Sequence, residues 1–133
     1  MMPYKPHQVD EADRTYSYKI MWLGLPCSIA LLIGLQFEAA ELLRILAGGF
    51  VAGTFISMAW SWKYDEFMRD EIALASGWAL SFAGLALFAQ IIPFAREYEP
   101  DAGMVLAIMA VIFHAALTFN RIRNGAFAGG AYD

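Results

Sequence analysis

The sequence predicts an all-α membrane protein, a bundle of four transmembrane helices, on two observations. First, four apolar stretches without Asp, Glu, Lys or Arg occupy residues 20–37, 45–62, 72–94 and 102–120. Each has about the 18 residues or more that a helix needs to cross a hydrocarbon core of roughly 30 Å. Second, 59% of the residues are hydrophobic and only 17% are charged, against about 25% charged residues in soluble domains.

Charge is absent all the way round each stretch, and this excludes a soluble four-helix bundle. The helices of a soluble bundle carry an apolar stripe on one face and charged residues on the other. No room is left for a separate soluble domain, so we expect residues 1–133 to form a single integral membrane domain with tails at 1–19 and 121–133. Connections of about seven to nine residues favour antiparallel neighbours in an up-down-up-down arrangement.

Residues 20–37 are interpreted as the first span, not as the apolar core of a secretory signal peptide. The preceding residues are mixed in charge, and the sequence after Phe37 lacks small residues at both positions that a signal peptidase requires. Pro26 lies about two turns into this span, where it either bends the helix or is accommodated by neighbouring helices.

Lys and Arg predict the orientation, because acidic residues contribute little to membrane topology. With the N-terminus in the cytoplasm, only Arg44 and Arg96 of the 9 Lys and Arg residues lie on the far side. We therefore expect both termini, and the connection at residues 63–71, to be cytoplasmic. The lipid bilayer is then the first partner of the chain.

Small residues predict helix-packing faces, since helices in lipid associate through close packing. The second span contains Gly49 and Gly53 in a GxxxG pattern, and the third has Ala73, Gly77 and Ser81 at four-residue spacing. Contacts inside this chain are the favoured interpretation of these faces. The alternative is an interface in a homo-oligomer or with other membrane subunits.

His114, in the fourth span, is the ionisable residue that we favour as the candidate for chemistry. An imidazole there binds haem or chlorophyll, relays a proton, or makes a hydrogen bond to a hydroxyl or carbonyl group on another helix. A bis-histidine haem needs two ligands, and His7 lies in the N-terminal tail. The structural hydrogen bond is therefore the favoured interpretation.

The charged connection before the third span contains Asp65, Glu66 and Arg69, spaced so that the arginine can pair with either carboxylate if the segment is helical. A solvated helix start is the simplest interpretation. Residues 65–69, placed before an Ala/Gly-rich apolar helix, resemble a pattern found in small bacterial inner-membrane proteins. The resemblance covers about thirty residues; it implies a bacterial source, the inner (plasma) membrane and a multi-span fold, and it implies no activity.

The sequence contains no nucleotide-binding, nucleophile-elbow or zincin motif, so we expect neither an enzyme nor a bound cofactor or metal. Its net charge of -4 is spread along the chain, which excludes a basic surface for nucleic acid. Three hypotheses of function follow. They are a packing or accessory subunit of a membrane assembly, a small transporter or channel component, and a haem- or pigment-binding protein built around His114.

Overall fold

The structure is a computed structural model that describes residues 11–37, 41–60, 66–95 and 101–124, with the backbone alone for residues 11–21. These residues form four helices. They are α1 (Glu11–Gln36), α2 (Glu41–Ala59), α3 (Glu66–Ala89) and α4 (Ala102–Arg123). The predicted all-α class is therefore confirmed for the described residues.

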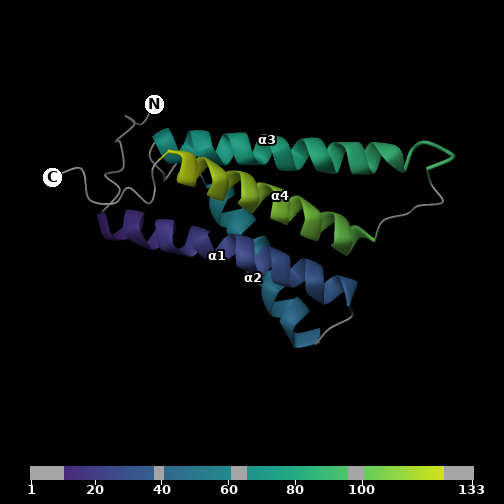
Figure 1. Cartoon of the computed structure of the whole chain (residues 1–133), viewed down its shortest axis with the longest axis horizontal. Coiled ribbons are helices and arrows are strands. Elements are labelled where there is room, and N and C mark those ends of the chain that lie inside the picture. Colours follow the sequence, from purple (N-terminus) through teal and green to yellow (C-terminus); the bar gives the residue numbers. More distant parts are fainter. Residues whose placement is uncertain (1–10, 38–40, 61–65, 96–100, 125–133) are drawn as a thin grey trace, which may run out of the picture.

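Helix α4 lies at the centre of the arrangement. It packs against α1 on one side and α3 on the other, and α2 packs against α1. Three helices follow the long axis, while α2 crosses them at a steep angle (Figure 1). The start of α3 and the end of α4 lie at the same end of the molecule, because these two neighbours are antiparallel (Figure 1). The order in space is thus α2, α1, α4, α3.

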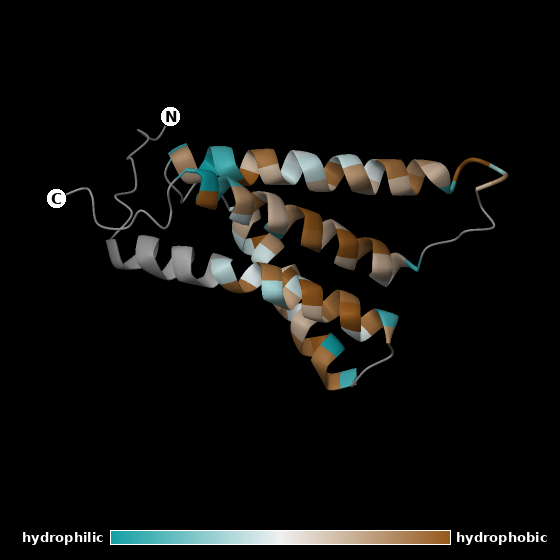
Figure 2. Cartoon of the chain, in the orientation of Figure 1, coloured by the Kyte–Doolittle hydropathy of each residue, from teal (hydrophilic) through white to brown (hydrophobic). Residues whose placement is uncertain are grey.

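Three of the helices, α2, α3 and α4, are long and apolar enough to cross a membrane. In α1, the described apolar part, Trp22–Gln36, is shorter. Hydrophobic residues cover the bodies of the helices, and polar residues gather near helix ends (Figure 2). Helix lengths and composition therefore indicate a membrane protein.

Helices α2 and α3 begin before the predicted spans, within the charged residues that precede them. Helix α2 begins at Glu41 instead of residue 45, and α3 begins at Glu66 instead of residue 72. The predicted spans end at the first charged residue. A helix continues through Glu, Lys and Arg, because all three residues favour the helical conformation. Helix α3 ends at Ala89, before the predicted residue 94, because Pro93 cannot continue a helix.

Two apolar clusters hold the helices together. One joins α3 and α4 to the end of α2, and its buried members are Met58, Met68, Ile72, Ala75, Ala79, Phe113 and Leu117. The other joins α1, α2 and α4 through Leu31, Ala47, Val51, Ala107 and Ala110. Alanines occupy many of these positions, since a small side chain lets two helix backbones approach closely.

Candidate functional site

His114 lies on α4 at the place where α1 and α2 meet it, and its side chain is fully buried. Nε2 of His114 lies 3.3 Å from Oγ1 of Thr54 on α2. The hydrogen bond to a hydroxyl group on another helix, favoured from the sequence, is therefore present. It joins α2 to α4 through two residues that are 60 positions apart in the chain.

The Thr54 hydroxyl determines which tautomer of His114 fits. It donates its proton to the carbonyl oxygen of Val51 at 2.7 Å. The same hydroxyl then acts as the acceptor for His114, so the ring proton belongs on Nε2. This leaves Nδ1 as the acceptor nitrogen, and Nδ1 is buried with no hydrogen-bond partner in the described part of the chain.

Gly24 of α1 lies directly against the other side of the ring. A Cβ atom at position 24 would overlap Nδ1 and Cε1 of His114 and would lie 2.9 Å from Cγ. Ser28, one turn later, is also fully buried, and its hydroxyl donates to the carbonyl oxygen of Gly24 at 2.7 Å. The absence of a side chain at position 24 is thus what allows α1 to cover the imidazole.

Two phenylalanines complete the surroundings of His114. The ring of Phe55 on α2 is stacked at 6.1 Å between centroids with an interplanar angle of 15°. Phe113 meets the imidazole edge to face at 5.0 Å and meets Phe55 in the same way at 5.3 Å. These contacts fix the ring in one orientation and exclude water from it.

This geometry does not fit an axial ligand of haem or chlorophyll. An axial histidine presents one ring nitrogen to open space above a metal, but Nε2 of His114 faces Thr54 and Nδ1 faces the backbone of Gly24. Within the described ranges, no group of three or more His, Cys, Asp and Glu side chains is placed to hold a metal ion. We interpret His114 as a structural residue.

A second polar cluster joins α3 to α4 near the end of the bundle where α4 ends. Nε of Arg121 lies 3.4 Å from Oε2 of Glu71, and both side chains are almost completely buried. The amide of Asn124 donates to Oε1 of Glu71 at 3.2 Å. An ion pair at this depth needs such additional hydrogen bonds to offset the loss of hydration.

This cluster is not predicted from the sequence, because Glu71 and Arg121 fall one residue outside the predicted spans, where a charged residue is usually solvated. A signal was available in the spacing. Glu71 shares the face of α3 that carries Met68, Ile72 and Ala75, and Arg121 follows His114 by seven residues on α4. Residues three, four or seven positions apart lie on the same side of a helix.

The predicted charged connection is described in part. Asp65 lies outside the described residues, while Glu66 and Arg69 are exposed in the first turn and a half of α3. Their exposure agrees with a solvated helix start.

The predicted packing faces point away from the other described helices, so the contacts inside the chain that the sequence favours for them are not found among the described residues. Five residues are exposed on the outside of α2 and α3, namely Gly49, Gly53, Ala73, Gly77 and Ser81. A Cβ atom added at any of the three glycines would meet nothing within 4 Å. Contacts inside the chain are made on the opposite faces, through residues such as Val51, Ala75 and Ala79. Both faces of α2 and α3 contain small residues, and spacing alone does not distinguish them.

Comparison with protein-family models, curated proteins and solved structures finds no match for this chain. The resemblance based on residues 65–69 gains no support from it, and the bacterial source stays an expectation. The function is therefore argued from the helices and their surfaces alone.

Proposed function

We propose that this chain is a four-span membrane protein, with α1 as the first span, that serves as a packing or accessory subunit of a larger membrane assembly. Gly103 and Arg121 are separated on α4 by roughly 27 Å of helix, close to the roughly 30 Å of a hydrocarbon core. Arg44 lies near the level of Gly103, because both residues line the same cavity, and Glu71 lies at the level of Arg121, with which it pairs. This spacing supports a bundle that crosses the bilayer with its charges at the two boundaries.

One observation carries the accessory role: the outward small-residue faces of α2 and α3. Large apolar side chains cover most of the exterior, as expected against lipid, and examples are Leu46, Leu80 and Leu85. At the outward faces the backbone itself is exposed, at Gly49 and Gly53 on α2 and at Gly77 on α3. Helices in lipid approach one another through such positions. A helix of another chain therefore suits these faces.

The buried polar residues support this role over transport. A transporter needs a hydrophilic path lined by polar groups. The described interior has the Thr54–His114 pair and the Glu71–Arg121 pair, and Leu117, which is 1% exposed, lies between them on α4. Each pair joins two helices through a contact between its own members, as expected of groups that hold a scaffold together.

Native mass spectrometry of the chain extracted from its own membrane in a mild detergent tests the proposal. We expect a complex of defined stoichiometry, either with a second copy or with another membrane protein. Replacing Gly53 or Gly77 with Leu should release the chain as a monomer that keeps its own unfolding temperature. A strictly monomeric wild-type chain would contradict the accessory role.

A further inference from the structure

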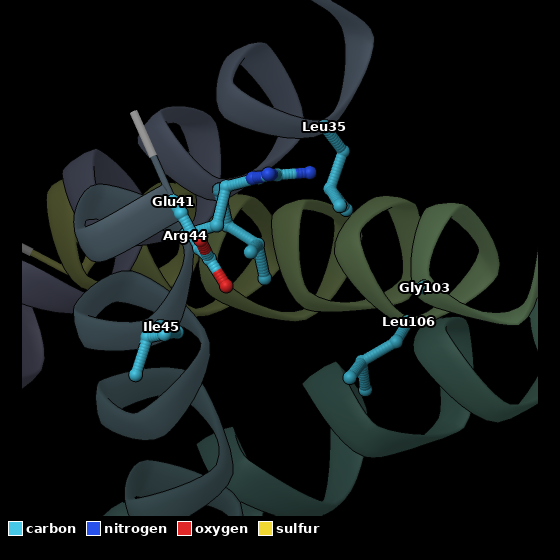
Figure 3. Close-up of a pocket in the computed structure, with 7 residues that line it drawn as sticks. Leu35, Glu41, Arg44, Ile45, Gly103 and Leu106 are labelled. Atoms are coloured by element: carbon cyan, nitrogen blue, oxygen red, sulfur yellow. The ribbon is translucent and has the colours of Figure 1, made fainter. Parts of the chain in front are cut away.

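A cavity of about 350 Å³ opens between α1, α2 and α4, at the end of the bundle where α2 and α4 begin. Its apolar wall is formed by Leu31, Leu35, Ile45 and Leu106. Two residues of opposite charge, Glu41 and Arg44, complete the lining from the first turn of α2 (Figure 3). The cavity is open to the outside and thus accessible to a ligand.

Arg44 reaches the cavity across α1. Its side-chain stem passes over Gly34, where an added Cβ atom would lie only 3.0 Å from Cγ of Arg44. Nε of Arg44 is buried and has no hydrogen-bond partner among the described residues. A buried N–H donor without an acceptor is unfavourable. The guanidinium group of this cavity-lining residue therefore has a donor that no acceptor among the described residues satisfies.

Glu41 does not neutralise this arginine. The two residues are three apart on α2, a spacing at which side chains on a helix commonly pair, yet among the described residues no ion pair joins them. Figure 3 shows the carboxylate and the guanidinium pointing in different directions at the cavity. Within the part of the chain that the structure describes, the cavity thus presents one positive and one negative group that are not paired with each other, and an apolar wall.

The chemistry of the lining selects a class of ligand. A guanidinium group binds phosphate with paired N–H donors, and a carboxylate accepts hydrogen bonds from an ammonium group. The leucine and isoleucine side chains suit hydrocarbon. The start of α4 lies at one boundary of the proposed membrane slab, so the cavity is at the depth of lipid headgroups.

We propose that this cavity binds one phospholipid whose headgroup carries both a phosphate and a primary ammonium, as in phosphatidylethanolamine. Arg44 donates to the phosphate oxygens, and Glu41 accepts from the ammonium group. One acyl chain lies along Leu31 and Leu35. The site rests on the proposed four-span arrangement, which puts the cavity at the depth of lipid headgroups, and it does not depend on the proposed accessory role.

Native mass spectrometry of the full chain, with added lipids of identical acyl chains, tests this site. We expect the wild-type protein to retain one phosphatidylethanolamine at roughly tenfold lower lipid concentration than phosphatidylglycerol, which lacks the ammonium group. Glu41→Gln should remove this preference. Arg44→Gln should weaken both lipids by roughly tenfold, and Arg44→Lys should restore part of the loss because it keeps the charge.

Glu66→Gln and Arg69→Gln serve as matched controls. These residues have the same three-residue spacing at the start of α3, but they are exposed and lie at the other end of the bundle. They should leave lipid retention unchanged. Equal retention of the two lipids by the wild-type protein, or equal effects of Arg44→Gln and Arg69→Gln, would overturn the site. Displacement of the lipid by millimolar phosphoethanolamine alone would also overturn it, since the apolar wall would then contribute nothing.

Discussion

His114 and Gly24 are in direct contact across the crossing of α4 and α1, with the imidazole occupying the space that a Cβ atom at position 24 would fill. The histidine also meets α2 through Thr54. One side chain therefore connects three of the four helices. Among the described glycines, Gly24 is the one at which an added Cβ atom would come closest to a neighbouring side chain.

Replacing Gly24 with Ala should destabilise the chain by about 1–3 kcal/mol, the usual cost of overpacking a filled interior. The methyl group would force either the histidine or α1 to move. Gly77→Ala is the matched control, because an added Cβ atom there meets nothing within 4 Å. Thermal unfolding in detergent compares the two variants, and equal unfolding temperatures would mean that the contact is not tight.

The hydrogen bond between His114 and Thr54 is expected to contribute roughly 1 kcal/mol, as interhelical bonds in membranes do. His114→Leu should lose that amount, and His114→Gln should keep most of it because the amide can still donate to the hydroxyl. A double-mutant cycle of His114→Leu with Thr54→Val isolates the pair. Strictly additive losses would show that the two side chains do not interact.

The ion pair between Glu71 and Arg121 should be much more sensitive to the loss of one partner than to the loss of both. Glu71→Met or Arg121→Met alone leaves a buried charge uncompensated, which costs about 3–5 kcal/mol. The double variant Glu71→Met with Arg121→Met should recover most of this loss. Denaturation in detergent measures it, and a double variant as unstable as the sum of the single ones would argue against the pair.

The orientation is tested with introduced cysteines in a chain that carries Cys27→Ser. Seven of the 9 Lys and Arg residues are assigned to the cytoplasmic side, so cysteines at Asp65 and Asn124 should resist an impermeant thiol reagent added to intact cells. A cysteine at Glu99 should react. Labelling of the cysteine at position 65 from outside the cell would contradict the predicted orientation.

The sequence alone predicted the helical class, the membrane character and the hydrogen bond of His114, because each depends on local composition or on the cost of a polar group among apolar ones. It did not predict which face of a helix turns inward. On α2 the buried Val51 and the exposed Gly49 and Gly53 alternate within five residues, and both faces are apolar. In lipid, hydrophobicity does not distinguish an interior face from an exterior one.

Because Val51 is buried and Gly53 is exposed, the expected order of the effects of Leu substitutions at these two positions is reversed. A GxxxG pattern inside the bundle predicts that Gly53→Leu disturbs the chain more than Val51→Leu. The structure predicts the opposite, because Val51 is 0% exposed whereas nothing lies within 4 Å of a Cβ atom at Gly53. Spacing identified a close-packing surface, and only the fold shows that no helix of the described chain fills it.

Site-specific photo-crosslinking in the native membrane tests the proposed role of that surface most directly. A photoreactive amino acid at Gly53 or Gly77 should form a crosslink of defined mass to another protein chain. The same group at Leu85, an exposed position among large apolar side chains, should react mainly with lipid. Crosslinks to lipid alone at all three positions would contradict the account, because the outward small-residue faces would then be ordinary membrane-facing surface.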